Sequence, residues 1–129
     1  MTTLALLTTA LLFGGMVLYS FGFAAFLFTH LSAEVAGPTL RKAFPFFYLF
    51  VIASAGLAAL LSLGHDLLSA ALLALIALST VPTRQILMPA INAATDAGNK
   101  ARFDRLHYLS VAITLVHIAL TAWVLARFL

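Results

Sequence analysis

The residues best suited to chemistry lie on one face near the C-terminal end of the chain. Between residues 106 and 126, every histidine, serine and threonine recurs at alternating intervals of three and four residues, at His107, Ser110, Thr114, His117 and Thr121. On an α-helix this spacing places all five within an arc of about 80°. We call this set the polar seam. Such groups can hydrogen-bond a neighbouring helix, hold a ligand or line a path for an ion.

The histidines suggest haem ligation as a second chemistry. His30 closes the first apolar stretch of the chain and His107 opens the last, so both are expected at a similar depth on facing helices, as a bis-histidine haem requires. His117 follows ten residues later, about 15 Å deeper. Hydrogen-bonded or solvated imidazoles are the alternative. We therefore keep His30 and His107 as candidate haem ligands and assign no other metal or cofactor.

Several chemistries are excluded by what the sequence lacks. There is no cysteine, which excludes disulfides, iron–sulfur clusters, thiolate zinc sites and covalently attached haem. No phosphate-binding loop, zinc motif or nucleophile–base pair is recognisable. The residues give no catalytic site, and we expect a protein that is not an enzyme.

The composition is that of a membrane protein. Hydrophobic residues make up 64% of the 129 residues and charged residues 9%, where soluble domains contain about 25%. So few charges cannot cover a soluble surface, which excludes a soluble enzyme. Four stretches contain no Asp, Glu, Lys or Arg: 1–33, 43–64, 67–83 and 106–126. Each approaches the roughly 20 helical residues that cross a bilayer.

These stretches predict an all-α membrane protein, an antiparallel bundle of four transmembrane helices in a single domain over residues 1–129. A segment in lipid must satisfy its own backbone hydrogen bonds, so each span is expected to be helical. The predicted spans are about 4–30, 44–63, 67–88 and 103–126.

Proline and glycine mark the expected breaks between helices. Gly37 and Pro38 are expected to break the first loop, and Pro45 suits the first turn of the second helix. Pro82 and Pro89 are expected to kink or end the third span near the cytoplasmic interface, with resumption of the helix through Thr95 as the alternative to an end. Two short turns complete the pattern, a hairpin at Gly64-His65-Asp66 and a helix end at Ala97-Gly98-Asn99.

The basic residues predict the orientation. Six of the seven Lys and Arg residues fall in the 31–43 and 84–105 connections, and only Arg127 lies elsewhere. The positive-inside rule therefore places these two longer loops in the cytoplasm and both termini outside, in the inner or plasma membrane. Asp66 cancels Arg127 on the outer side. Nucleic-acid binding is not expected from this distribution.

Two further sets of residues have expected roles in the membrane. Small residues let helix backbones approach closely, and the candidates for helix packing are Gly14, Gly15, Gly22, Ser54 and Ala58. Basic and aromatic side chains anchor spans at the headgroups, and the candidates for interfacial or lipid contacts are Arg84, Lys100, Arg102, Arg105 and Trp123.

Local motifs resemble a known family. They are Gly14-Gly15, Ala43-Phe-Pro-Phe-Phe-Tyr48, Thr83-Arg-Gln-Ile-Leu-Met-Pro89 and Arg102-Phe-Asp-Arg-Leu-His-Tyr-Leu-Ser110. Together they are similar to the uncharacterised family of four-helix membrane proteins that includes transmembrane protein 205. Phe103, His107 and Ser110 match its aromatic–x–x–x–His–x–x–Ser signature, whereas Thr114 replaces its frequent Asn and Tyr108 its usual Gly. The resemblance implies a four-helix membrane fold and no established reaction.

The sequence thus favours a non-catalytic integral membrane protein. We expect an accessory or scaffolding subunit that packs against other membrane subunits, with the lipid bilayer and either partner subunits or further copies of the chain as its contacts. A haem-binding redox protein with His30 and His107 as ligands is the first alternative. A small transporter that uses the polar seam is the second.

Overall fold

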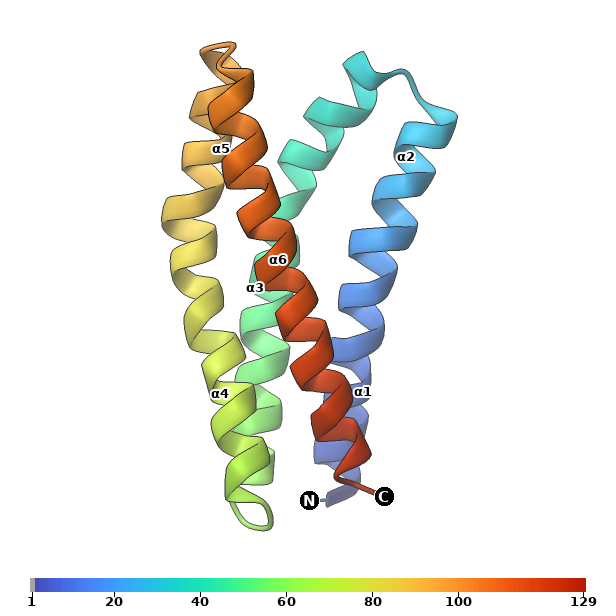
Figure 1. The fold of residues 1–129 in the computed structure, drawn as a ribbon. Helices are drawn as coiled ribbons and strands as arrows, with labels where there is room; N and C mark the ends of the chain where they lie inside the picture. Colours follow the sequence, from blue (N-terminus) through green and yellow to red (C-terminus); the bar gives the residue numbers. More distant parts are fainter. Residues whose placement is uncertain (1) are drawn as a thin grey trace.

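Four long helical segments form an antiparallel bundle in the computed structural model, which describes residues 2–129 (Figure 1). All four are long and apolar enough to cross a membrane, which confirms the predicted all-α, four-span fold. The first segment is α1 (Thr2–Val17), the π-helical turn η1 (Leu18–Phe23) and α2 (Ala24–His30), and the second is α3 (Ala33–Ser62). The third is α4 (Leu67–Pro82), the π-helical turn η2 (Thr83–Leu87) and α5 (Met88–Asp96), and the fourth is α6 (Lys100–Ala126).

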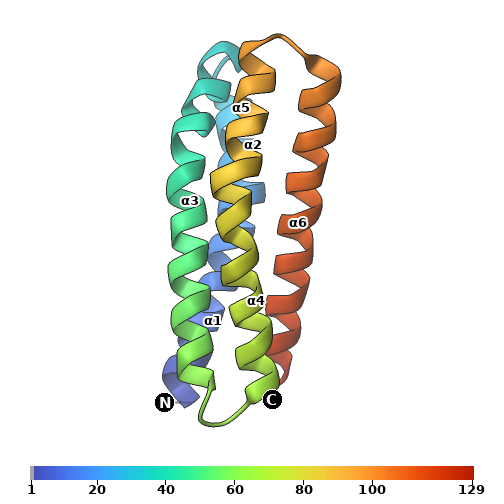
Figure 2. The same cartoon turned by 90° about the vertical axis from the view of Figure 1, so that its left-hand side faces the viewer.

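The segments pack in a ring. Helix α3 contacts both α1 and α4, and α6 closes the ring against α1 on one side and α4 and α5 on the other (Figures 1 and 2). Both termini and the 63–66 connection lie at one end, which we call the neutral end (Figure 1). The opposite end holds the 31–32 and 97–99 connections, and we call it the basic end because six of the seven basic residues lie in the half of the bundle nearest to it.

The core is built from small and medium apolar side chains of all four segments. Leu12 and Met16 of the first segment meet Val51 of α3, Leu73 of α4 and Val124 of α6, and each of these is almost fully buried. Large apolar side chains also cover the outside of every segment, as expected where the solvent is lipid rather than water.

The second helix is longer than predicted. It begins at Ala33, so the expectation that Gly37 and Pro38 break a loop is wrong, and Pro38 and Pro45 lie inside α3. The φ angle of proline is compatible with a helix, and each ring removes one hydrogen bond. Packing of Ala36 and Leu40 against Leu27 of α2 offsets that loss, because it buries apolar surface only if α3 continues.

The third helix also continues past its prolines, to Asp96 rather than residue 88. Pro82 ends the regular part and the wider turn η2 follows immediately before Pro89. An ordinary helix would drive the Pro89 ring into the carbonyl four residues earlier, and a π-helical turn relieves that clash. The expected longer loops at the basic end are therefore mostly helix, and the basic residues of these regions lie within helices, with Arg84 near the middle of its segment.

The two predicted turns are confirmed. Gly98 has a φ of 67°, and the Asn99 amide donates to the Ala94 carbonyl, which is the hydrogen bond of a Schellman helix end. The Asn99 side chain then accepts from the Arg102 amide and begins α6. At the neutral end, Asp66 caps α4 in the same way by accepting from the Ser69 amide.

Candidate functional site

The polar seam lies on α6, a helix of 27 residues that contains no Pro or Gly to interrupt it. Three of its five members, Ser110, His117 and Thr121, are buried, and Thr114 is half-buried. These four face the bundle, as a polar stripe in a membrane must. His107 differs from the prediction because it is exposed, and its ring lies parallel to Phe103 with the centroids 5.4 Å apart. At this level, one turn above Ser110 and close to the basic end, an imidazole can be solvated.

One member of the seam bonds another helix. The His117 Nε2 and the Ser79 Oγ on α4 lie 2.8 Å apart, and the same hydroxyl lies 3.3 Å from the Ile76 carbonyl. A carbonyl only accepts, so both contacts are satisfied together if His117 donates from Nε2 and Ser79 donates to Ile76. The contact joins the third and fourth spans in the middle of the bundle.

The other buried hydroxyls of the seam stay within their own helix. Ser110 donates to the His107 carbonyl and Thr121 to the His117 carbonyl, each at 2.7 Å. Such bonds satisfy a buried hydroxyl without contributing to contact between helices. Among the described residues, the polar seam therefore forms one side-chain hydrogen bond to another helix, the contact of His117 with Ser79 on α4.

A small cavity lies beside His117. It measures about 10 Å³, which is the space that one water molecule needs. Five of its wall residues are polar and come from α3, α4, η2 and α6: Tyr48, Thr80, Thr83, Thr114 and His117. A polar hollow of this size can hold a single hydrogen-bonded water and nothing larger.

A Ser–His contact resembles a nucleophile and its base, but this one is not placed for catalysis. A nucleophilic pair needs room for a substrate and a third group that orients the histidine. The hollow beside His117 has no such room, and no Asp or Glu lies between residues 67 and 95 or between 105 and 129. The geometry supports a structural hydrogen bond.

The two candidate haem ligands lie on different segments near the basic end, and both are exposed. The His30 ring stacks on Phe26, and its Nδ1 donates to the Phe26 carbonyl at 3.0 Å. Within residues 2–129, no group of three or more His, Asp and Glu side chains is placed to hold a metal ion. Haem ligation by His30 and His107 stays a prediction.

The candidate packing residues differ in their surroundings. A Cβ added at Gly15 would clash with the Phe50 ring, so α1 and α3 meet closely there. At Gly14 an added Cβ meets nothing within 4 Å, and at Gly22 it meets only Leu18 of the same segment. On α3, Ser54 and Ala58 are buried.

The candidate anchors differ in their position along the bundle. Arg84 lies in η2, near the middle of the third segment, and its Nε donates to the Pro45 carbonyl of α3 at 3.2 Å. Lys100 pairs with Asp104 at 2.9 Å. Arg102 and Arg105 form no ion pair among the described residues. Trp123 is exposed near the neutral end of α6.

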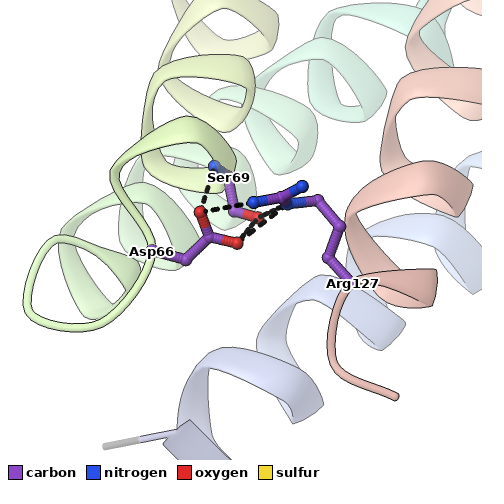
Figure 3. A network of polar contacts seen from close by, with 3 residues as sticks. All are labelled: Asp66, Ser69 and Arg127. Carbon is purple, nitrogen blue, oxygen red and sulfur yellow. Dashed lines mark hydrogen bonds and ion pairs between the residues drawn. The ribbon is translucent and has the colours of Figure 1, made fainter.

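A second polar cluster joins the ends of two spans at the neutral end (Figure 3). Arg127 donates to both carboxylate oxygens of Asp66, from Nε at 2.9 Å and from the terminal nitrogen at 3.0 Å, and Ser69 also donates to Asp66. The hydrogen bonds from the Arg127 guanidinium, and to a smaller extent those from Ser69, hold the pKa of the Asp66 carboxyl well below its ordinary range. We call these three residues the clasp.

Sequence reasoning did not identify the clasp or Ser79. The sequence predicts that Asp66 and Arg127 carry opposite charges on the same side of the membrane, which is the signal it contains for their pairing. The third span carries Ser79 next to Thr80, and nothing in the spacing indicates which hydroxyl faces His117. The rotation of α4 about its axis decides this.

Residues 7–100 match the model of a family described as a domain of unknown function, DUF4149. The match covers the first three segments and ends at the first residue of α6, so the polar seam lies beyond it. No curated protein and no solved structure matches the chain. The resemblance to the family that includes transmembrane protein 205 stays a prediction.

Proposed function

Because the chain belongs to the DUF4149 family, whose description assigns no activity, we propose its role from the structure: a non-catalytic accessory or scaffolding subunit of a membrane assembly. The observation that carries the proposal is the closed core. The hollow beside the polar seam has space for about one water molecule, which is too little for a substrate. The proposed role therefore depends on contacts made by the outer surface of the bundle.

That surface supports contact with other membrane proteins. Large apolar side chains project outward from every span, among them Leu18, Phe46, Leu78 and Val116. Helices in lipid associate through van der Waals packing and hydrogen bonds between helices rather than through apolar burial from water. A bundle with short connections of two to four residues has little else to offer a partner.

The experiment is purification of the tagged full-length chain from its native membrane in mild detergent, followed by native mass spectrometry. We expect complexes in which the chain is bound to a second membrane protein or to further copies of itself. A population consisting of lone monomers would contradict the proposal.

We also propose that the basic end faces the cytoplasm. The half of the bundle nearest to it carries six cationic and three acidic side chains, whereas Asp66 and Arg127 of the neutral end cancel. Since the chain contains no cysteine, Ser32→Cys and Gly64→Cys each introduce a single thiol at opposite ends. In intact cells a membrane-impermeant maleimide should label Gly64→Cys and spare Ser32→Cys, and the reverse pattern would refute the orientation.

A permeation pathway is the second candidate, and the polar lining around His117 favours it. If ions or protons cross along the seam, His117→Leu abolishes flux in liposomes, whereas Ser110→Ala, which removes a bond within α6, does not. Unchanged flux in His117→Leu excludes this role.

The haem proposal has its own test. If His30 and His107 ligate haem, the purified protein shows a Soret absorbance band after haem is supplied, and His30→Ala removes it. Absence of the band in the supplemented protein rules out haem binding.

A further inference from the structure

The half of the bundle nearest the basic end contains a packed cluster of its own. Leu27 of α2 is buried against Ala36 and Leu40 of α3, and the apolar side chains around them also come from the first two segments: Phe23, Ala24 and Phe44. The main core, in contrast, takes residues from all four segments. Toward the basic end, α2 and α3 diverge from α5 and α6 (Figure 1). Residues 24–44, which we call the lid, therefore pack as a separate unit.

Both helices of the lid are irregular where the lid begins. The π-helical turn η1 directly precedes α2, and in α3 the ring of Pro45 leaves the Arg41 carbonyl without the usual helical N–H. Tyr19 of η1 stacks on Phe47, two residues after Pro45, with the ring centroids 4.7 Å apart, so the two irregular turns lie side by side. Helices bend at prolines and at π-helical turns. We call η1 and Pro45 together the hinge.

Beyond the hinge, an ion pair joins the lid to the rest of the bundle. Among the described residues, the side-chain hydrogen bonds between the first two and the last two segments come from Arg84 and Arg41. Arg84 donates to the Pro45 carbonyl at the hinge itself. Arg41 reaches from the lid to Asp96 at the end of α5. Both side chains of this pair are exposed, so water weakens it and little free energy is needed to separate them.

A buried hydroxyl in the hinge lacks a partner. The Ser20 Oγ of η1 is shielded from solvent and forms no hydrogen bond among the described residues. Met16, four residues earlier and on the same face by the helical period, lines the polar hollow beside His117. An unpaired buried hydroxyl costs free energy in the closed bundle. Water that enters when the lid opens can bond to Ser20, which lowers the free energy of the open form.

We propose that the lid swings about the hinge, with the ion pair of Arg41 and Asp96 as its latch, and that the open form admits water from the basic end to Ser20 and the polar hollow. The half nearest the neutral end stays closed, because fully buried side chains of all four segments pack together there, among them Leu12 and Val124. Opening concerns the interior of the bundle, so it does not depend on an accessory role of the outer surface.

Opening is tested by the rate at which a small hydrophilic methanethiosulfonate reagent modifies a single cysteine in the purified full-length chain. The chain has no cysteine of its own, so Ser20→Cys carries a single thiol. Ser62→Cys is the matched control, because the Ser62 Oγ is also buried without a partner but lies at the neutral end of α3. We expect Ser20→Cys to react about tenfold faster or more, since opening of the lid is local. Equal rates overturn the proposal.

The latch is tested by adding Asp96→Asn to the Ser20→Cys chain. Loss of the Arg41 pair should raise the reaction rate about two- to fivefold, which is the contribution of an exposed ion pair. Asp104→Asn, which breaks the Lys100 pair within α6 at the same end, is the matched control and should leave the rate unchanged. No rise with Asp96→Asn, or an equal rise in the control, refutes the role of this ion pair.

The hinge is tested by adding Pro45→Ala to the Ser20→Cys chain. Alanine supplies an N–H for the Arg41 carbonyl, so α3 should bend less and the rate should fall about two- to tenfold, the net effect of one hydrogen bond. A variant that merely destabilises the bundle would instead raise the rate. Pro38→Ala makes the same change inside the lid and should leave the rate unchanged. An unchanged or higher rate with Pro45→Ala, or an equal fall with Pro38→Ala, overturns the proposed hinge.

Discussion

All four prolines and both π-helical turns lie in the half of the bundle nearest the basic end, whereas every helical part of the neutral half is regular α-helix. The neutral half is packed through small side chains, with Ala5, Thr9, Ser62 and Thr121 fully buried. In the basic half, aromatic rings fill the space between segments, and Tyr19 stacks on Phe47 with the centroids 4.7 Å apart.

This difference has a physical consequence. Small residues bring backbones close, and a closely packed region has no room for added volume. Rings and wider turns fill larger gaps between helices. Added side-chain volume should therefore destabilise the neutral half most, and the basic half should be the part that accommodates a ligand. Four predictions test this difference between the two halves, in order of decreasing expected effect.

Adding volume to the neutral half should have the largest effect. Ala58 is fully buried on α3, and Ala58→Leu should lower the free energy of unfolding by about 1–3 kcal/mol because the added side chain forces the helices apart. The measurement is thermal unfolding in detergent followed by circular dichroism. Gly56→Leu on the same helix is the control, since an added Cβ there meets nothing within 4 Å. Equal melting temperatures for both variants would show that the neutral half is not tightly packed.

Removing the contact between α4 and α6 should have a smaller effect. Ser79→Ala leaves His117 without its partner and should cost about 0.6 kcal/mol, the average for hydrogen bonds between membrane helices. Ser110→Ala, which removes a bond within α6, is the comparison and should change stability less. The prediction fails if the two variants lose the same stability in the same unfolding assay.

The clasp should show the pH dependence of a lowered carboxyl pKa. Asp66 favours its charged form in the folded protein, so the contact contributes its full stability above about pH 4, the ordinary range of an aspartate. That contribution is lost as the pH falls through the lower pKa of the folded state. Asp66→Asn should therefore be less stable than the native chain at pH 7, and the difference should narrow steadily as the pH falls below about 4.

Trp123 provides the readout for this prediction. It is the only tryptophan, and the Arg127 guanidinium lies 5.9 Å from its ring centre. Acidification should change its fluorescence in the native chain and not in Asp66→Asn. Asp104→Asn, which breaks the Lys100 pair at the other end of α6, should keep the native acid response. An identical response in all three proteins would show that Trp123 does not report the clasp.

The smallest effect is expected at the ion pair between α3 and α5. Arg41 and Asp96 bond through two contacts of 2.6 and 2.9 Å, but both side chains are well exposed at the basic end. Water weakens such pairs, so Asp96→Asn should leave the melting temperature close to that of the native chain. A loss larger than that of Ser79→Ala would mean that the basic half depends on this bridge.

Much of the fold could be predicted from the sequence, and less of the candidate site. The spans, the hairpin at residues 64–66 and the helix end at Gly98 follow from local composition and backbone preference. The continuation of α3 through Pro38 could not be predicted, because it depends on contact of Ala36 and Leu40 with a different helix. His107 shares its helical face with Ser110, yet only Ser110 is buried.

The sequence by itself determined that the chain is a membrane bundle, since the thickness of the hydrocarbon layer requires uncharged helical stretches of a minimum length. It also determined the separation of a basic end from a neutral end. Only the tertiary structure decided which groups meet: His117 with Ser79, Arg127 with Asp66, and Gly15 with Phe50. These contacts depend on how far each helix is rotated and shifted against its neighbours. In lipid, close packing and a few hydrogen bonds between helices determine these rotations and shifts. The sequence pattern of one helix alone does not predict them.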